Sequence, residues 1–472
     1  MLNTENGGLN ILSYIDQKIG TYLRKNIIFP FYWKYIKHSN VLSCYKVLRD
    51  HQWNTLEENK KIQRKKLYKL IEYASENIPY YKRIIQKYNI QFSEDTIFKD
   101  IKKFPLLTKD VIRNHFDELY KFRDHTYYRN SSGGSTGEPV IFYQDSDCFA
   151  WNTATKILFD EWAGRKIGEP MVKLWGSIED ILRGGGQGFK EYLRQQLSGV
   201  INLSSAKVSE EDMHRYLKTI NKIKPGLILA YAHFMGEFTR FIQNHHLPVY
   251  SPRSIMTSAC VLFPEIRKNI EDVFQTTLFN RYGSREVGNI GCNCDKSIGL
   301  HLIPDIHYLE IVDDEGREVK AGKPGNIIIT LLTNYTMPLI RYKIGDRGVL
   351  SEKNGLCRHG LPFLEKIEGR IVGHFKNKFG DIISGGFFFA ILLSCKNIKQ
   401  FQIIQEEIEF ISINLVLIDK TKLKNMKKDF KEINKKIKLA MGNSTKIKYN
   451  IVNEIEPSPS GKYMYSYSKI SN

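Results

Sequence analysis

The chain has 472 residues, of which 42% are hydrophobic and 26% charged, and its formal net charge is +19 at pH 7. This composition is typical of a globular protein of about two to four domains or subdomains. No apolar run approaches the ~18 residues of a membrane-spanning helix, and no basic region followed by an apolar block opens the chain, so we expect neither a transmembrane helix nor a secretory signal. Seven Cys in so long a chain do not form a disulfide framework, which indicates a cytoplasmic protein.

The positive charge suggests an anionic partner: a nucleotide, a phospholipid surface or a nucleic acid. Because no zinc-finger, homeodomain or RNA-recognition signature occurs, we expect no nucleic acid partner, and a solvated Lys-rich surface explains much of the charge. The aromatic and basic stretch of residues 26–33 could contact the inner face of a membrane. We expect it instead to pack as a short N-terminal arm.

Helical spacing marks the next segment, residues 57–88. Apolar residues recur at Leu67, Leu70, Ile71 and Ala74, and the proline at position 79 predicts the end of that helix. Further on, Thr108 is placed to cap a new helix that starts within residues 104–112.

A hydroxyl- and glycine-rich loop follows. Glycine lets the backbone approach a ligand closely, and successive N–H groups can surround an anion such as phosphate. No Gly-Lys-Ser/Thr follows, so the loop is not a Walker A loop. Residues 140–143 after it look like a strand, so we expect a hairpin, and a plain turn is the alternative. The loop reads Ser131-Ser132-Gly133-Gly134-Ser135-Thr136-Gly137-Glu138-Pro139.

Strand-like and helix-like segments then alternate from residue 150 to 260, which predicts a largely parallel sheet with covering helices. We expect strands at 172–176, 227–231 and 254–257, and helices at 210–223, 234–245 and 264–274. Residues 308–312 and 326–330 look like strands of a more antiparallel region. Beyond residue 369 the pattern predicts a small α+β domain with a Lys-rich helix at 420–440. The expected fold class is therefore α/β combined with α+β.

Three later segments offer partners for the loop. In Tyr282-Gly283, the ring can lie flat against a purine, and Glu286 is a hard oxygen donor suited to Mg²⁺. Asp346, reached through Gly345, can accept hydrogen bonds from both ribose hydroxyls. Lys462, on a Ser-Gly-Lys tail, can neutralise charge on a carboxylate and an α-phosphate. Taken singly, each is better explained as a turn, a salt bridge or an exposed tail.

Together these motifs resemble the acyl-adenylate-forming enzyme superfamily. Within it the chain looks most like the phenylacetate–coenzyme A ligase branch and its capsular-polysaccharide-biosynthesis relatives. The resemblance implies an N-terminal arm with helices (1–60), a large adenylate-forming domain of mixed sheets and helices (61–369) and a small mobile lid domain (370–472). It also places the family's hinge Gly-Arg at Gly369-Arg370.

The resemblance implies a two-step reaction that uses ATP and Mg²⁺. A carboxylate attacks the α-phosphate, which gives an acyl-adenylate and pyrophosphate, and a nucleophile then takes the acyl group and releases AMP. The implied catalytic residues are Lys462, Glu286 and Arg370. The implied nucleotide-binding residues are Ser131, Ser132, Gly133, Gly134, Ser135, Thr136, Gly137, Tyr282, Gly283 and Asp346.

Two positions depart from the family pattern. Glu138 stands where the family loop has Lys, which removes a positive charge near the pyrophosphate. Gly373 stands where the family usually has the hinge Asp, which puts the second half-reaction in doubt.

A second group of residues suits Zn²⁺, whose usual ligands are Cys and His. Related ligases carry such residues at comparable places, and the resemblance favours Cys294, His301, Cys357 and His359, with Cys292 in reserve. Buried free Cys and surface His are the alternative.

The leading hypothesis is ATP-dependent activation of a small carboxylic acid and transfer to an amine, sugar or thiol acceptor, in synthesis of a surface polysaccharide. One alternative is an aryl- or acyl–coenzyme A ligase, with Trp175, Tyr231, His233 and Phe234 as candidates for lining the acyl pocket, although core packing is the better explanation of each residue taken singly. A non-catalytic ligase-like scaffold is the alternative of another class. The acid, the use of coenzyme A and the oligomeric state stay open.

Overall fold

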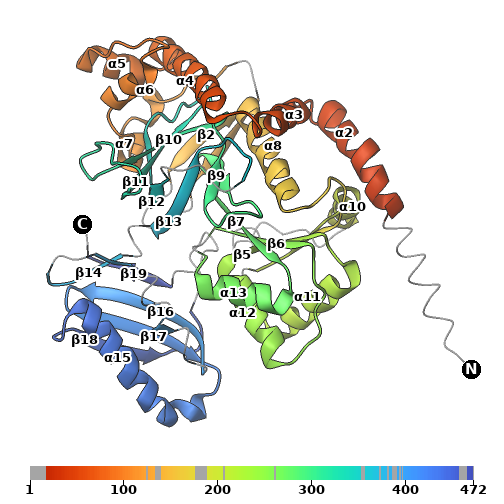
Figure 1. Ribbon diagram of the computed structural model, residues 1–472, viewed down its shortest axis with the longest axis vertical. Coiled ribbons are helices and arrows are strands. Elements are labelled where there is room, and N and C mark those ends of the chain that lie inside the picture. Colours follow the sequence, from red (N-terminus) through yellow and green to blue (C-terminus); the bar gives the residue numbers. More distant parts are fainter. Residues whose placement is uncertain are drawn as a thin grey trace, which may run out of the picture.

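A computed structural model describes residues 18–123, 126–132, 140–175, 189–205, 208–259, 262–351, 357–370, 374–379, 382–384, 388, 391–392, 395, 397–455 and 465–470. A large body with a long mixed sheet and covering helices lies beside a small α+β unit (Figure 1). The expected fold class, α/β combined with α+β, is confirmed. The limits of the three expected segments stay predictions.

Helices form the N-terminal part. Residues 18–36 make one helical stretch that contains η1 (Arg24–Ile28), α2 (Phe29–Phe31) and η2 (Tyr32–Ile36). The following helices are α3 (Val41–His51), α4 (Leu56–Asn77), α5 (Pro79–Tyr88), α6 (Ile97–Asp100), η3 (Ile101–Lys103), α7 (Lys109–Asn114) and η4 (Phe116–Glu118).

Local signals set the limits of these helices. Thr55 and Glu58 form a capping box at the start of α4, which satisfies two otherwise unpaired N–H groups. The helix ends at Asn77, as Pro79 predicts, and Pro79 then begins a second helix, α5, which the expected helical segment of residues 57–88 did not separate from the first. Thr108 accepts from the Val111 N–H at 3.3 Å, so the predicted cap of α7 is confirmed.

The expected hairpin is also present. Strands β1 (Tyr127–Ser131) and β2 (Ile141–Asp145) pair antiparallel and make a two-stranded sheet of their own. The Asp145 carboxylate then caps α8 (Ser146–Trp162) by accepting from the Cys148 N–H at 2.8 Å. The glycine-rich loop is thus followed by a strand, and α8 starts directly behind that strand.

The parallel half of the large sheet holds five strands: β3 (Met171–Leu174), β4 (Val200–Leu203), β5 (Leu227–Tyr231), β6 (Ser254–Ser258) and β7 (Thr277–Ser284). All neighbouring pairs among them are parallel, as the alternating pattern predicts. Helices α10 (Phe189–Ser198), α11 (Glu210–Ile223), α12 (Ala232–Asn244) and α13 (Pro264–Phe274) connect them. The apolar residues of α11, α12 and α13 make the core on one face, and α8 packs on the other.

The antiparallel half continues the same sheet, which has the order β10-β11-β12-β13-β9-β8-β7-β6-β5-β3-β4. Strand β13 lies between β12 and β9. The strand of this sheet that comes last in the sequence therefore joins its two halves. These strands are β8 (Gly288–Cys292), β9 (Leu300–Leu302), β10 (His307–Val312), β11 (Pro324–Leu331), β12 (Tyr342–Leu350) and β13 (Phe363–Arg370).

The small unit has a four-stranded sheet in the order β18-β17-β16-β19, covered by α15. Within it, Gln400 donates to the buried Glu237 of α12 at 3.1 Å, so the unit contacts the large body. None of the helices in the described part of the chain has the length and apolar character that a membrane crossing requires. The elements are β14 (His374–Lys376), β15 (Ile382–Ser384), β16 (Ile398–Glu407), β17 (Phe410–Leu417), η6 (Lys420–Met426), α15 (Lys427–Met441), β18 (Lys446–Ile451) and β19 (Ser466–Ser468).

A buried ion pair joins the N-terminal helices to the sheet. Arg341 is only 4% exposed and lies 3.1 Å from a carboxylate oxygen of Glu310. Its Nη1 also donates to the carbonyls of Lys102 and Phe104, at 3.0 and 2.8 Å. The pair therefore fixes residues 102–104 against β10.

We expect Arg341→Met to lower the free energy of unfolding by about 3–5 kcal/mol, because it leaves the Glu310 carboxylate buried without its partner. Burial already raises the pKa of Glu310, and Arg341 opposes that shift. The midpoint of urea unfolding measures the effect. Arg317→Met, which removes an exposed arginine paired with Asp313, is the matched control and should leave the midpoint nearly unchanged. Equal midpoints for both variants would contradict the prediction.

Candidate active site and metal centre

The hairpin holds the ends of the glycine-rich loop. Ser131 pairs with Ile141, and the buried Ser132 forms two bonds with Val140. Its N–H donates to the Val140 carbonyl at 2.8 Å, and its hydroxyl accepts from the Val140 N–H at 2.9 Å. Gly133, Gly134, Ser135, Thr136, Gly137, Glu138 and Pro139 lie outside the described residues.

Strand β7 carries Tyr282 and Gly283 to the edge of the site. A Cβ at Gly283 would lie 2.5 Å from the carbonyl oxygen of Gly288 on the paired strand β8. That distance is a clash, so only glycine permits this close approach of the two strands. The pairing of β7 with β8 also shifts register between Tyr282 and Gly283. Such an irregularity bends the strand, here just before the turn.

Glu286 lies on the turn between β7 and β8, only 6% exposed. Its carboxylate accepts from the Tyr342 hydroxyl at 3.2 Å. Gln144 of β2 donates to the carbonyls of Arg285 and Glu286, at 3.2 Å each. The turn that carries the expected magnesium ligand is therefore tied directly to the hairpin of the glycine-rich loop.

Asp346 is the residue of the site that strand β12 supplies. It lies on β12, is 9% exposed, and accepts from the Tyr282 hydroxyl at 2.7 Å. In the register of β12 and β13, Asp346 stands opposite Arg370. The expected adenine, ribose and hinge residues therefore lie together, although the side chain of Arg370 is outside the described part of the structure.

The remaining expected positions need separate comment. Lys462 and Gly373 lie outside the described residues. Among the expected acyl-pocket residues, Trp175 and Tyr231 face one another with ring centroids 4.1 Å apart. Phe234 is 3% exposed and packs on Phe238, so it belongs to the core between the sheet and α12; the side chain of His233 is not among those described.

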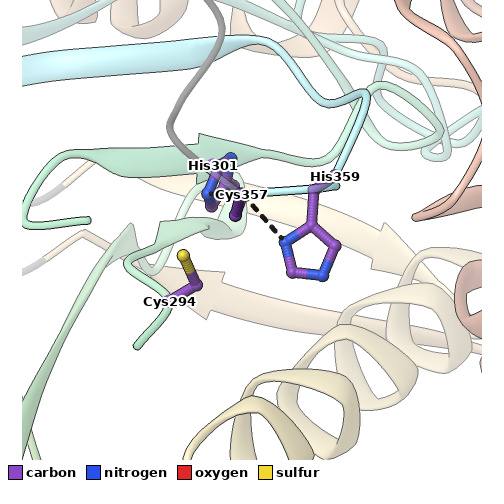
Figure 2. A group of neighbouring side chains, drawn as sticks. All are labelled: Cys294, His301, Cys357 and His359. Carbon is purple, nitrogen blue, oxygen red and sulfur yellow. Dashed lines mark hydrogen bonds between the residues drawn. The ribbon is translucent and has the colours of Figure 1, made fainter. Parts of the chain in front are cut away.

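The four expected zinc ligands, Cys294, His301, Cys357 and His359, do come together (Figure 2). Their ligand atoms all lie within 4.8 Å of one another. The Cys357 sulfur is 3.1 Å from His301 Nε2 and 3.5 Å from His359 Nδ1. Tetrahedral Zn²⁺ with its usual bond lengths needs ligand atoms about 3.3–3.8 Å apart, so these two sulfurs and two nitrogens would hold the ion after small adjustments of the side chains.

Two tryptophan rings border this cluster. The His359 ring stacks on Trp162 at 5.0 Å and lies 4.7 Å from the ring of Trp53. Burial lowers the pKa of His301 to about 4, with His359 adding to the effect, and burial raises the pKa of Cys294 to about 11. The histidines are therefore neutral and able to bind a metal, whereas the thiol must lose a proton on binding. Cys292 is buried but is not part of this group.

Sequence reasoning missed Gln144 and Tyr342, which orient the Glu286 turn. Gln144 follows the expected strand by one residue, and Tyr342 lies between the expected ribose residue and a buried segment. Neither position has a sequence signal that separates it from an ordinary strand residue, because its partner is distant in the chain.

Comparison with known proteins agrees with this geometry. Residues 375–469 match the family described as the CapK C-terminal domain. Protein CapK of Staphylococcus aureus is 23% identical over 413 residues, which cover 87% of this chain and 89% of that protein. The phenylacetate–coenzyme A ligase of Thermus thermophilus is 24% identical over 328 residues, which cover 66% of this chain and 71% of that ligase.

A solved structure of 2-hydroxyisobutyryl-CoA ligase, in the postadenylation state in complex with R3-HIB-AMP, matches with a TM-score of 0.69 and 15% identity, over 89% of this chain and 91% of that one. The chain has the fold of the acyl-adenylate-forming ligases. The predicted resemblance to the phenylacetate–coenzyme A ligase branch and to CapK is confirmed, and so is the expected enzyme class, an AMP-forming ligase.

Proposed function

We propose that the chain activates a carboxylic acid with ATP as an acyl-adenylate and then transfers the acyl group to an amine, sugar or thiol acceptor. The observation that carries this proposal is the convergence of Tyr282, Asp346 and the Glu286 turn, the last bound to the hairpin through Gln144. Three segments that are far apart in the sequence, the hairpin, residues 282–286 and Asp346 on β12, thus meet where a nucleotide would need them.

Different residues would serve different functions in the first step, the formation of the acyl-adenylate. The loop amides and hydroxyls of residues 131–137 would hold the phosphates, Tyr282 the adenine ring and Asp346 the ribose hydroxyls. Glu286, a buried carboxylate, suits Mg²⁺, which would offset phosphate charge when bound. Lys462 would balance the charge that develops as the carboxylate meets the α-phosphate, since two anions must otherwise approach one another.

The second step rests on Arg370 and the residues after it. We propose that residues 370–472 act as a lid that rotates at Gly369-Arg370, with Gly373 in place of the usual acidic pivot. Glycine turns easily but offers no carboxylate to hold either lid position. We place the reaction in surface polysaccharide synthesis in the cytoplasm, which rests on the resemblance to CapK; a coenzyme A acceptor is the alternative that the resemblance to phenylacetate–coenzyme A ligases favours.

Release of pyrophosphate from ATP and Mg²⁺ tests the proposal. Amino acids and aromatic, fatty and uronic acids would each be supplied, with reactions lacking acid or Mg²⁺ as controls. We expect one class of acid to stimulate release well above the controls. Adding coenzyme A or amino sugars then identifies the acceptor by AMP formation. A chain that binds no ATP would refute the ligase and favour a non-catalytic scaffold.

We also propose that Cys294, His301, Cys357 and His359 hold a structural Zn²⁺. The four side chains come from the β8–β9 turn, β9 and the segment before β13, and they leave no open coordination position. The ion would thereby join these segments beneath Trp53 and Trp162.

Finally, we propose that the helical stretch of residues 18–36 contacts an anionic membrane surface. Arg24 attaches the stretch to the rest of the protein, because its Nε donates to the Gly168 carbonyl at 2.7 Å. No Asp or Glu occurs from residue 18 to 49, so the stretch is purely cationic. Large apolar side chains on it are 37–64% exposed: Ile19, Tyr22, Leu23, Ile27, Phe31, Tyr32, Tyr35 and Ile36. Exposed apolar area beside basic residues is the pattern of interfacial helices.

Sedimentation with vesicles measures this contact. We expect the protein to pellet with vesicles that contain phosphatidylglycerol and much less with phosphatidylcholine alone. The double variant Ile27→Glu/Phe31→Glu should reduce the bound fraction about tenfold, because it removes buried apolar area and adds repulsion. Ile298→Glu, at a single isoleucine that is 75% exposed elsewhere, is the control. Equal pelleting of all three proteins would exclude the contact.

A further inference from the structure

Four side chains from four different elements hold the turn that carries Glu286. Two of them, from β2 and β12, bind the first two carbonyls of the turn and the Glu286 carboxylate. The other two are His307, the first residue of β10, and Asn152 of α8. They bind the residues that follow Glu286, and neither belongs to the proposed nucleotide contacts. The position of the carboxylate therefore depends on both ends of the turn.

His307 binds the carbonyl next to Glu286. Its Nε2 lies 2.7 Å from the Val287 carbonyl oxygen. Because a carbonyl can only accept, Nε2 carries the ring proton that makes this bond. Burial lowers the pKa of His307 to about 4, so the ring is neutral at pH 7 and has a single N–H to donate. The other ring nitrogen, Nδ1, is buried and has no hydrogen-bond partner among the described residues.

The backbone of His307 is fixed as well. The residue is only 2% exposed, and its carbonyl accepts from the side-chain amide of Gln63 at 2.6 Å. Gln63 belongs to α4 and is itself buried. If the ring turned away, the Val287 carbonyl would lose its partner, which is costly for a buried polar group. Helix α4 is therefore connected through His307 to the turn that carries Glu286.

Asn152 holds the other end of the turn. Its Oδ1 accepts from the backbone N–H of Asn289 at 2.9 Å and from the side-chain amide of Asn289 at 2.7 Å. That amide also donates to the Asn152 carbonyl at 3.2 Å. Gly288 makes room for this contact, because its φ is +76° and a Cβ on it would lie 2.5 Å from Asn152 Oδ1. Helix α8 is thereby bonded to the start of β8.

These bonds matter because a metal ligand must point in one direction. Residues 285–287 belong to neither β7 nor β8, so side chains supply the hydrogen bonds that a sheet would otherwise provide. Mg²⁺ requires nearly ideal octahedral geometry, which a loosely held carboxylate does not offer. Groups that orient a metal ligand are typically worth about 10- to 100-fold in metal affinity.

We propose that His307 and Asn152 are positioning residues for the magnesium ligand Glu286. They fix the backbone on its carboxyl-terminal side and so hold its carboxylate in the direction that metal binding requires. This inference rests on the proposed function, because it takes Glu286 as the ligand. It adds that the affinity for the metal depends on two residues that touch neither the metal nor the nucleotide.

Two pairs of variants separate this positioning from general stability. Glutamine at position 307 carries an amide N–H at about the place of the histidine Nε2, whereas asparagine is shorter and carries its N–H near the place of Nδ1. Aspartate at position 152 keeps the accepting oxygen, and alanine removes it. His307→Gln and Asn152→Asp should therefore retain the bonds to the turn, while His307→Asn and Asn152→Ala should lose them.

Binding of Mn²⁺ to the full chain in the presence of α,β-methylene-ATP, followed by electron paramagnetic resonance, tests the inference. We expect His307→Asn and Asn152→Ala to raise the dissociation constant for Mn²⁺ by about 10-fold or more, and the two conservative variants to stay within about threefold of wild type. The affinity for α,β-methylene-ATP without metal should be the same in all of these proteins.

Thr276→Val is the control, because the Thr276 hydroxyl donates to the carbonyls of Pro252 and Arg253 at the opposite end of β7 from the turn. Circular dichroism checks that each variant folds. Wild-type affinity for Mn²⁺ in a folded His307→Asn or Asn152→Ala chain would overturn the inference. So would a loss of the same size in His307→Gln, in Asn152→Asp or in Thr276→Val.

Pyrophosphate release separates this inference from the proposed function. Binding of Mn²⁺ that depends on His307 and Asn152, without release from any acid, would retain the positioning role and refute the ligase. Release that needs the same Mg²⁺ concentration in wild type and in Asn152→Ala would retain the ligase and refute the positioning role. A wild-type chain that binds no Mn²⁺ beside the nucleotide would refute Glu286 as the ligand, and the inference with it.

Discussion

Replacing Glu286 by glutamine is expected to lower the rate of pyrophosphate release by about 10²- to 10³-fold, while ATP still binds. Glutamine keeps the size of the side chain and can still accept from the Tyr342 hydroxyl, which lies 3.2 Å from the carboxylate. It cannot supply the negative charge that a hard divalent ion requires. The loss should therefore fall on the chemical step rather than on the fold.

Single-turnover pyrophosphate release, with ATP binding measured separately, checks this prediction. Glu265→Gln is the matched control, since Glu265 is an exposed residue at the start of α13. A rate within a few fold of wild type at saturating Mg²⁺ would show that the ion is held elsewhere. Partial recovery by Mn²⁺, which binds carboxylate and amide oxygens, would support the assignment.

Removing the proposed zinc is expected to have the second large effect. Cys357→Ser should abolish the metal content, measured by plasma mass spectrometry as about one zinc per wild-type chain, and should lower the midpoint of thermal unfolding by about 10 °C or more. The reason is that Cys357 touches both His301 and His359, so its loss opens the group at its centre. Incubation of the wild type with a strong chelator should produce a similar shift.

Cys292→Ala provides the control for this experiment. Cys292 is buried two residues from Cys294, yet its sulfur is not part of the group. The variant should keep its zinc even if it loses some stability. Wild-type protein that is purified without metal and is insensitive to chelator would refute the zinc site, and free buried cysteines would then be the better interpretation.

The limits of helices and strands were predictable where capping residues, prolines and glycines occur in the sequence. Helices α11 and α13 and strand β5 have the limits that the sequence predicts, residues 210–223, 264–274 and 227–231. The order of the sheet was not predictable, because the insertion of β13 between β12 and β9 depends on pairing between distant residues. Periodicity reports which face of a strand is buried, but it does not report which strand lies next to it.

Some residues of the site were also predictable from the sequence, and others were not. Tyr282, Glu286 and Asp346 could be named from local motifs, and the structure brings Tyr282 into contact with Asp346. The four metal ligands could be named from residue type and resemblance. Gln144 and Tyr342 could not be named, because the Glu286 turn that they contact is distant from both in the chain.

The placement of β13 also bears on how the protein is made. While the ribosome is still adding residues 351–362, β9 and β12 each present an edge with no neighbour on that side, since their shared partner is not yet synthesised. The two halves of the large sheet can form early, but they cannot join until residues 363–370 emerge. Nascent chains that stall in this interval would expose two open strand edges and become clients of chaperones.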